Sequence, residues 1–256
     1  MTITLGYSRQ SMPSALKIAE ASGGQIEAVR SSDTDINWGR RTGTGLNPDI
    51  TNAVNKRRMR ELFAEHDVPA PRLYTAAEAE MRLAANAGTD SPVTLIGRPD
   101  FHTRKRGFWV CNTIADFDKA IVGTRRKMAA THFIEFAYPE QEFRVHIFNG
   151  RSIRISEKEF VEGRKYTTIK PTIPVGHIRK AAKAAVQAVG LDFGCVDILA
   201  DAEHAYALEV NAAPGLGGSM PTLWADTFIK HFGGVPSVIN SDGYDVEIDY
   251  RYGEES

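Results

Sequence analysis

Two short apolar runs, each carrying one acidic residue, constrain the fold of this chain most. They lie at 196–199 and 206–210. If the polar residues 201–205 connect them, antiparallel pairing places Asp197 directly across from Glu209, and the two-residue period of a strand puts Asn211 on the same face. Opposed carboxylates repel unless one is protonated or a cation lies between them, and oxygen donors suit Mg²⁺. The pattern indicates a metal site; the alternative is an ordinary hairpin in which one or both carboxylates point to solvent.

A glycine-rich loop, residues 212–219, directly follows the second acidic strand. It leads into a helix expected from about Pro221 to His231, with proline in the first turn. Glycine lets the backbone approach a ligand, and free N–H groups near a helix N-terminus attract anions. A plain turn with a helix cap is the alternative. The position of Gly215 beside the acidic strands favours a ligand site.

A third pattern is the alternating hairpin around Asn149 and Gly150, with strands expected at 143–148 and 153–156. A three-residue loop with a left-handed Gly150 keeps apolar and polar faces separate. It pairs Arg144 with Ser156 and Glu142 with Lys158, and places Phe143, Val145, Ile147, Ile153 and Ile155 on one face. The other face is rich in cations, which suits a polyphosphate, although a solvated face is the commoner outcome. On that face we expect His146 to be structural.

The remaining elements predict an α+β protein with a small α/β unit at its N-terminus. We expect a strand at Ile3–Tyr7, a helix at 14–21, a strand at 25–29, a helix at 50–66, and a helix at 177–189 ended by Gly190. Further strands are expected at 93–96, 108–111 and 133–136. The expected domains are an N-terminal unit (1–50), a helix and linker (51–90), a small lobe (91–137), a large lobe (138–235) and an acidic tail or hairpin (236–256).

Composition excludes several classes of protein. The 256 residues carry a formal net charge of -1, which disfavours a bulk nucleic-acid binder, although the basic runs 56–58, 104–106 and 125–127 leave a smaller polyanion open. The sequence shows neither a membrane span nor a signal peptide, and Cys111 and Cys195 have no metal-ligand spacing. We therefore expect a cytoplasmic protein without membrane contact. Homo-oligomer formation is left open.

Taken in order, five motifs resemble the ATP-grasp superfamily over about residues 45–235. They are Asn55-Lys56, Leu95-Ile-Gly-Arg98-Pro, the segment from Phe133 to Arg144, Gly194-Cys-Val-Asp197 and Leu208-Glu209-Val-Asn211-Ala-Ala-Pro-Gly215. The resemblance is greatest to the branch of ribosomal-protein glutamate ligases and glutathione synthetase. It implies two antiparallel α+β lobes that hold a nucleotide between them.

The resemblance also implies roles for individual residues. Lys56 and Arg98 match the cations on the nucleotide phosphates. Glu135, Phe136 and Tyr138 match the strand that holds adenine, and Glu142 matches the ribose acid. Asp197, Glu209 and Asn211 match the magnesium ligands, with Mn²⁺ as an alternative ion. Arg144 and Lys158 match basic residues near the transferred phosphate and acyl group. In the implied reaction, the attack of the amine would form a tetrahedral oxyanion near Arg144 and the backbone of the loop that begins at Gly215.

The implied function is ATP-dependent ligation of a carboxylate to an amine through an acyl phosphate. The substrates expected are small molecules or peptides. An idle nucleotide-binding module that contacts nucleic acid or protein, or a phosphotransferase without ligation, is the alternative. Three departures from the family stand out: arginine instead of lysine at Arg98, a basic flap at 104–106 instead of a glycine-rich one, and Cys195 at a position that is basic in D-alanyl-D-alanine ligases. Cys195 and the short N-terminal unit disfavour the D-alanine substrate.

Overall fold

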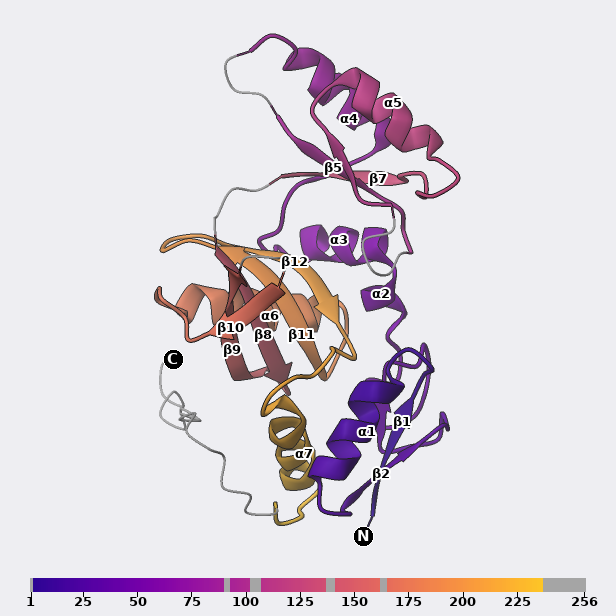
Figure 1. Cartoon of the computed structure of the whole chain (residues 1–256), viewed down its shortest axis with the longest axis vertical. Coiled ribbons are helices and arrows are strands. Elements are labelled where there is room, and N and C mark those ends of the chain that lie inside the picture. The colour runs from indigo at the N-terminus through magenta and orange to yellow at the C-terminus, as the bar shows by residue number, and fades with distance from the viewer. Residues whose placement is uncertain (1, 90–92, 102–106, 137–140, 162–164, 237–256) are drawn as a thin grey trace.

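The computed structural model describes residues 2–89, 93–101, 107–136, 141–161 and 165–236. The elements form three groups along the long axis of the molecule (Figure 1). A small sheet with two helices lies at one end, a five-stranded sheet in the middle, and a parallel unit at the other end. The α+β class and the two antiparallel lobes are therefore confirmed. Within the described residues, no helix is long and apolar enough to cross a membrane.

The N-terminal unit is a three-stranded parallel sheet. β1 (Ile3–Tyr7) lies between β2 (Ile26–Val29) and β3 (Ile36–Trp38), and α1 (Met12–Ala21) connects β1 to β2. The sequence pattern does not predict β3, because three residues are too few to show a strand period. Its three side chains are all buried, which makes β3 part of the core.

The small sheet is antiparallel and has the strand order β4-β7-β5-β6. Its strands are β4 (Leu73–Tyr74), β5 (Leu95–Arg98), β6 (Trp109–Cys111) and β7 (His132–Glu135). α4 (Ala76–Ala85) and α5 (Ile114–Val122) pack on the face that carries Leu95 and Phe133. β4 and α4, which fall in the expected linker, thus pack with the small lobe. The opposite face of the sheet is left for the site.

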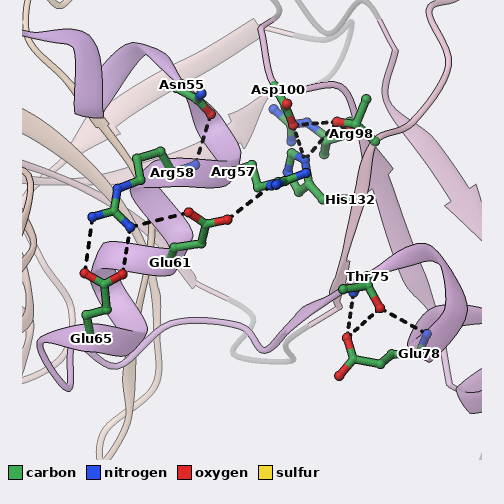
Figure 2. Close-up of polar contacts among 11 residues, drawn as sticks. Asn55, Arg57, Arg58, Glu61, Glu65, Thr75, Glu78, Arg98, Asp100 and His132 are labelled. Atoms are coloured by element: carbon green, nitrogen blue, oxygen red, sulfur yellow. Dashed lines mark hydrogen bonds and ion pairs between the residues drawn. The ribbon is translucent and has the colours of Figure 1, made fainter.

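The expected helix at 50–66 is two helices, α2 (Thr51–Val54) and α3 (Lys56–Glu65). Asn55 separates them because its backbone is extended, with a ψ of 106°. Its side-chain oxygen accepts a hydrogen bond from the backbone N–H of Arg58, 3.0 Å away, and so caps α3 (Figure 2). The prediction of one continuous helix at 50–66 was therefore wrong. The break places Lys56 in the first turn of α3.

The large sheet is antiparallel, in the order β10-β9-β8-β11-β12. Its elements are β8 (Gln141–Phe148), β9 (Arg151–Val161), β10 (Lys165–Ile169), β11 (Phe193–Ala200) and β12 (Ala205–Asn211), with α6 (Gly176–Ala188) between β10 and β11. α6 and α3 bury one face of the sheet in a common core with Phe143, Val145 and Ile147. The other face is free to carry polar side chains.

The β8–β9 hairpin corrects the predicted loop but keeps the predicted pairing. Arg144 pairs with Ser156 and Glu142 with Lys158, as expected. The turn, however, has only two residues, Asn149 and Gly150, both with positive φ (46° and 72°), which is the type I′ pattern. A bulge after His146 supplies the missing residue, and it places Ile153 against the N-terminal core rather than beside Phe143.

α7 (Met220–His231) joins the N-terminal unit to the large sheet. Trp224 and Phe228 of α7 pack against Trp38 of β3 and Phe193 of β11, and the Trp38 and Phe193 rings stack at 5.6 Å. The expected flap at 104–106 and nearly all of the expected acidic tail lie outside the described residues.

Candidate active site

β11 and β12 bring the predicted acidic residues together. Asp197 lies directly opposite Glu209 in the strand register. Asn211 shares their face: its Nδ2 donates to Glu209 Oε1 at 3.2 Å and lies 3.5 Å from Asp197 Oδ2. Asp197 is only 7% exposed, so the alternative of two carboxylates pointing to solvent does not hold for it.

This register arises from a shorter connection than expected, followed by a bulge. Ala200 pairs with Ala205, so the turn has four residues rather than five. The pairing then shifts between Asp197 and Ile198, which leaves Leu208 as the extra residue of β12. The bulge restores the opposition of Asp197 and Glu209.

Arg60, which the sequence did not single out, holds this bulge. Its side chain is buried, and it donates hydrogen bonds to the carbonyl oxygens of Leu208 and, at 3.0 Å, Ala207. Burial and the nearby Arg98 lower the pKa of Arg60 to about 10, against the opposing effect of Glu209. The sequence feature that could have pointed to Arg60 is its place next to Met59, among the residues of α3 that are buried.

Cations of the chain itself neutralise both carboxylates. Arg144 Nε lies 3.0 Å and Lys158 Nζ 3.1 Å from Asp197 Oδ1, and Lys56 Nζ lies 3.4 Å from Glu209 Oε2. Burial alone would raise the pKa of Glu209, but Lys56, Asn211 and Arg98 lower it to about 2. Burial alone would lower the pKa of Arg144, and Asp197 reverses that shift. Thus a metal is not the only resolution of the repulsion between the two acids.

A cavity of about 560 Å³ opens between the small sheet, α3 and the large sheet. Its volume lies within the range of small-molecule sites. Apolar walls come from both lobes, among them Ile96 and Ile134 of the small sheet and Leu199 of the large one. Nine of the predicted site residues line it: Lys56, Arg98, Glu135, Phe136, Glu142, Lys158, Asp197, Glu209 and Asn211.

Two predicted residues do not line this cavity. Arg144 lies behind Asp197, to which it gives two hydrogen bonds. Gly215 is exposed in the loop between β12 and α7, with open space where a Cβ would lie. Tyr138 lies outside the described part of the chain.

The end of the small sheet presents cations to the cavity. Arg98 ends β5, and burial lowers its pKa. Lys56 begins α3, and its backbone N–H donates to the carbonyl of Asp100 at 2.8 Å. Figure 2 shows the side chain of Asp100 bonded to His132, close to Arg98. His132 was not predicted as a site residue, because in the sequence it is a single polar residue at the start of a short apolar strand.

The predicted adenine strand is anchored to its own lobe. Tyr74 Oη donates to Glu135 Oε2 at 2.6 Å, and Arg82 Nη2 donates to Glu135 Oε1 at 3.2 Å. Burial alone would raise the pKa of Glu135, but these two donors lower it. Phe136 adds an apolar wall with 42% of its surface exposed. The predicted ribose acid Glu142 forms an ion pair with Lys158 across the strands.

The donor chemistry of Asp197, Glu209 and Asn211 fits a hard divalent cation. Asp197, Glu209 and Asn211 all line one cavity, with the amide nitrogen of Asn211 directed at the two carboxylates, and Mg²⁺ binds carboxylate and amide oxygens together with phosphate oxygens of a substrate. In the described part of the chain, no group of three or more His, Cys, Asp or Glu side chains is arranged for a metal.

No protein-family model and no curated protein matches the sequence. Solved structures do. The D-alanine–D-alanine ligase of Bacillus anthracis complexed with ATP aligns with a TM-score of 0.62 at 15% identity, covering 89% of this chain and 93% of that chain. ATP-grasp ligase PsnB, complexed with a minimal precursor, gives 0.62 at 15% identity, covering 90% and 98%.

A third structure, an ATP-grasp RimK domain protein from Sphaerobacter thermophilus, aligns with a TM-score of 0.57 at 14% identity and covers 88% of this chain and 98% of that chain. The three alignments cover nearly the whole length of each neighbour and about nine-tenths of this chain. The chain has the ATP-grasp fold.

Proposed function

We propose that this chain is an ATP-dependent carboxylate–amine ligase, which activates a carboxylate as an acyl phosphate and releases ADP and phosphate. One observation carries the proposal: the cavity between two ATP-grasp lobes is lined by apolar side chains, by the cations Lys56 and Arg98, and by the paired acids Asp197 and Glu209. That arrangement suits a magnesium-bound polyphosphate. The structural neighbours support it, because their names include ligases with ATP or with Mg and ADP.

Charge balance explains why such a site is needed. A carboxylate must approach a phosphate although both are anions, and an amine cannot displace an unactivated carboxylate oxygen. Lys56 and Arg98 offset the phosphate charge, while Asp197, Glu209 and Asn211 would hold Mg²⁺. When bound, MgATP supplies the phosphoryl group and the electrophilic phosphorus.

The chain's own residues then position the substrates. Lys158 binds Asp197 and lines the cavity, so in the proposed site it would also lie near the transferred phosphate and acyl group, whereas Arg144, behind Asp197, would hold that acid in place. Glu142 holds Lys158 from the other side. The backbone of the Gly215 loop follows Asn211 directly and would contact the acyl group. The apolar walls and the small lobe would limit the access of water to the cavity, which would protect an acyl phosphate from hydrolysis.

The test is a screen of amino acids, polyamines and peptides for ADP release that depends on an added amine, with mass spectrometry of the product. The expected result is a product whose mass equals acid plus amine minus water. E209Q, which is close in size to the native residue, should lose turnover, and R57Q on the exposed side of α3 should retain it.

Two outcomes would contradict the proposal. ADP release that needs an acceptor but forms no amide would indicate phosphoryl transfer. Nucleotide binding without turnover across the whole screen would indicate an idle module.

A further inference from the structure

His132 has a free ring nitrogen at the wall of the cavity. Its Nδ1 lies 3.4 Å from Asp100 Oδ1 and 3.4 Å from the Thr131 hydroxyl, and Thr131 donates to the same Asp100 oxygen at 2.6 Å. With Nδ1–H donated to Asp100, Nε2 carries the lone pair. Nε2 has no hydrogen-bond partner in the described part of the chain. The ring is only 3% exposed, yet it lines the cavity.

Charged groups surround this ring on three elements. Arg98 lies opposite His132 in the β5–β7 register, and Arg60 approaches from α3. Asp100, which follows β5, is the carboxylate beside the ring. Burial, Arg60 and Arg98 outweigh Asp100 and lower the pKa of His132 to about 4. The imidazole is therefore neutral near pH 7.

A bound polyphosphate would reverse this balance. Its negative charge would offset Arg60 and Arg98, and Asp100 would still stabilise a positive ring from the other side. Without a proton, the lone pair of Nε2 would repel the lone pairs of the phosphate oxygens. With one, it would donate a charge-assisted hydrogen bond.

We propose that His132 is a further phosphate-binding residue of the nucleotide site, which takes up one proton from solvent on nucleotide binding and is held in place by Asp100. The inference rests on the proposed nucleotide site and adds to it a residue outside the motifs of the sequence. Asp100 is then a positioning residue, because it acts through the ring.

The proposal fixes the direction of the pH dependence. His132 gains its proton between its low pKa in the free protein and its higher pKa in the complex. Nucleotide affinity should therefore fall as pH rises from about 4 towards the pKa of the complex, by up to tenfold per pH unit, and level off above it.

The experiment is calorimetric titration of wild type and H132Q with MgADP at several pH values between 5.5 and 8. Each titration is run in two buffers of different ionisation enthalpy, which yields the number of protons taken up. Protonation of the nucleotide itself is common to both proteins and cancels in the comparison. Wild type should take up more protons than H132Q, and its affinity should depend more steeply on pH. D100N should reduce the difference while retaining the imidazole.

Equal proton uptake and equal pH dependence in wild type and H132Q would overturn the proposal. If H132Q does not fold, the imidazole ring signals of wild type decide: the His132 signals should shift towards the protonated form on saturation with MgADP at pH 7, and unchanged signals would overturn it. Failure of wild type to bind MgADP would instead contradict the proposed nucleotide site. That result differs from binding by both proteins with equal proton uptake, which would contradict only the role of His132.

Discussion

Each acid of the site already has a cation beside it. Lys56 lies against Glu209, while Arg144 and Lys158 lie against Asp197. Removing either acid therefore leaves a buried or half-buried cation unpaired, which costs more than the relief of repulsion between the acids. Asn and Gln are the better substitutions here, because they keep the shape and some of the hydrogen bonds.

At Arg60, replacement by methionine should destabilise the protein and disturb the site. R60M leaves the carbonyls of Ala207 and Leu208 without their charged donor, at a cost of about 1–3 kcal/mol in the free energy of unfolding. R57M on the same helix removes an exposed ion pair with Glu61 and should cost under about 0.5 kcal/mol. Urea denaturation measures both. Equal losses would show that Arg60 does not hold the bulge.

Buried histidine makes the fold sensitive to acid. His146 accepts a hydrogen bond from Trp224 Nε1 at 3.2 Å, and burial lowers its pKa to about 3. In the unfolded chain a histidine takes up its proton near pH 6.5. The stability that the neutral ring contributes is therefore complete above about pH 6.5 and is lost as pH falls towards 3.

The melting temperature, measured as a function of pH for wild type and for a variant, isolates the contribution of His146. H146Q should flatten the decline in melting temperature between pH 6.5 and 4 relative to wild type. An unchanged slope would assign the acid sensitivity to other groups. Such a result would fit a role for His132, whose pKa is lowered to about 4, whereas the lowered pKa of Glu209 acts at more acidic pH.

At the scale of elements, the two site hairpins show how far a sequence can predict this fold. Strand alternation predicted which residues face each other, and the pairs Asp197–Glu209 and Arg144–Ser156 are correct. The loop lengths deduced from those pairs were wrong, because a shorter turn plus a bulge gives the same pairing. The alternation of polar and apolar residues predicts which side chains share a face of the sheet. It does not predict whether an extra residue lies in the turn or in a bulge.

The remaining site residues could not be predicted for a related reason. Arg60 and His132 act through contacts between α3, β12 and the small sheet, which are far apart in the sequence. Likewise, Glu135 was assigned to adenine from the resemblance, and its bonds to Tyr74 and Arg82 depend on β4 and α4, which the sequence pattern did not show.

The end of β7 predicts a preference for ATP over GTP. The amides of Glu135 and Phe136 already donate to Arg72 and Thr94 carbonyls. The carboxylate of Glu135 lines the cavity, and we expect it to contact the base while it also accepts from Tyr74 and Arg82. A carboxylate accepts from the amino group of adenine and repels the carbonyl oxygen of guanine.

E135Q can also donate, so it should lower the ATP-to-GTP affinity ratio by roughly tenfold, about the worth of one hydrogen bond. Calorimetric titration of both nucleotides with magnesium measures the ratio. Equal affinities of wild type for ATP and GTP would contradict this assignment of β7.

At the scale of the whole molecule, one aromatic core couples the N-terminal unit to the large lobe. Trp38 lies fully buried among Phe193, Trp224 and Phe228. Because α7 follows the Gly215 loop, this core also fixes the end of that loop. The N-terminal unit thus supports the site without lining the main cavity.

W38A should destabilise the chain by about 3–5 kcal/mol, the usual cost of truncating a buried aromatic residue. V122A on the small lobe removes an apolar side chain that is 78% exposed and should change stability by under about 0.5 kcal/mol. Thermal unfolding compares the two. A small effect of W38A would show that the N-terminal unit is not coupled to the large lobe.

The central claim is that the cavity joins a carboxylate to an amine through an acyl phosphate. Once the screen identifies the two substrates, the acid is labelled with ¹⁸O in its carboxylate and the released phosphate is weighed by mass spectrometry. The account predicts that one labelled oxygen moves to phosphate for each amide formed, and that E209Q abolishes the transfer. Amide formation with unlabelled phosphate would contradict it.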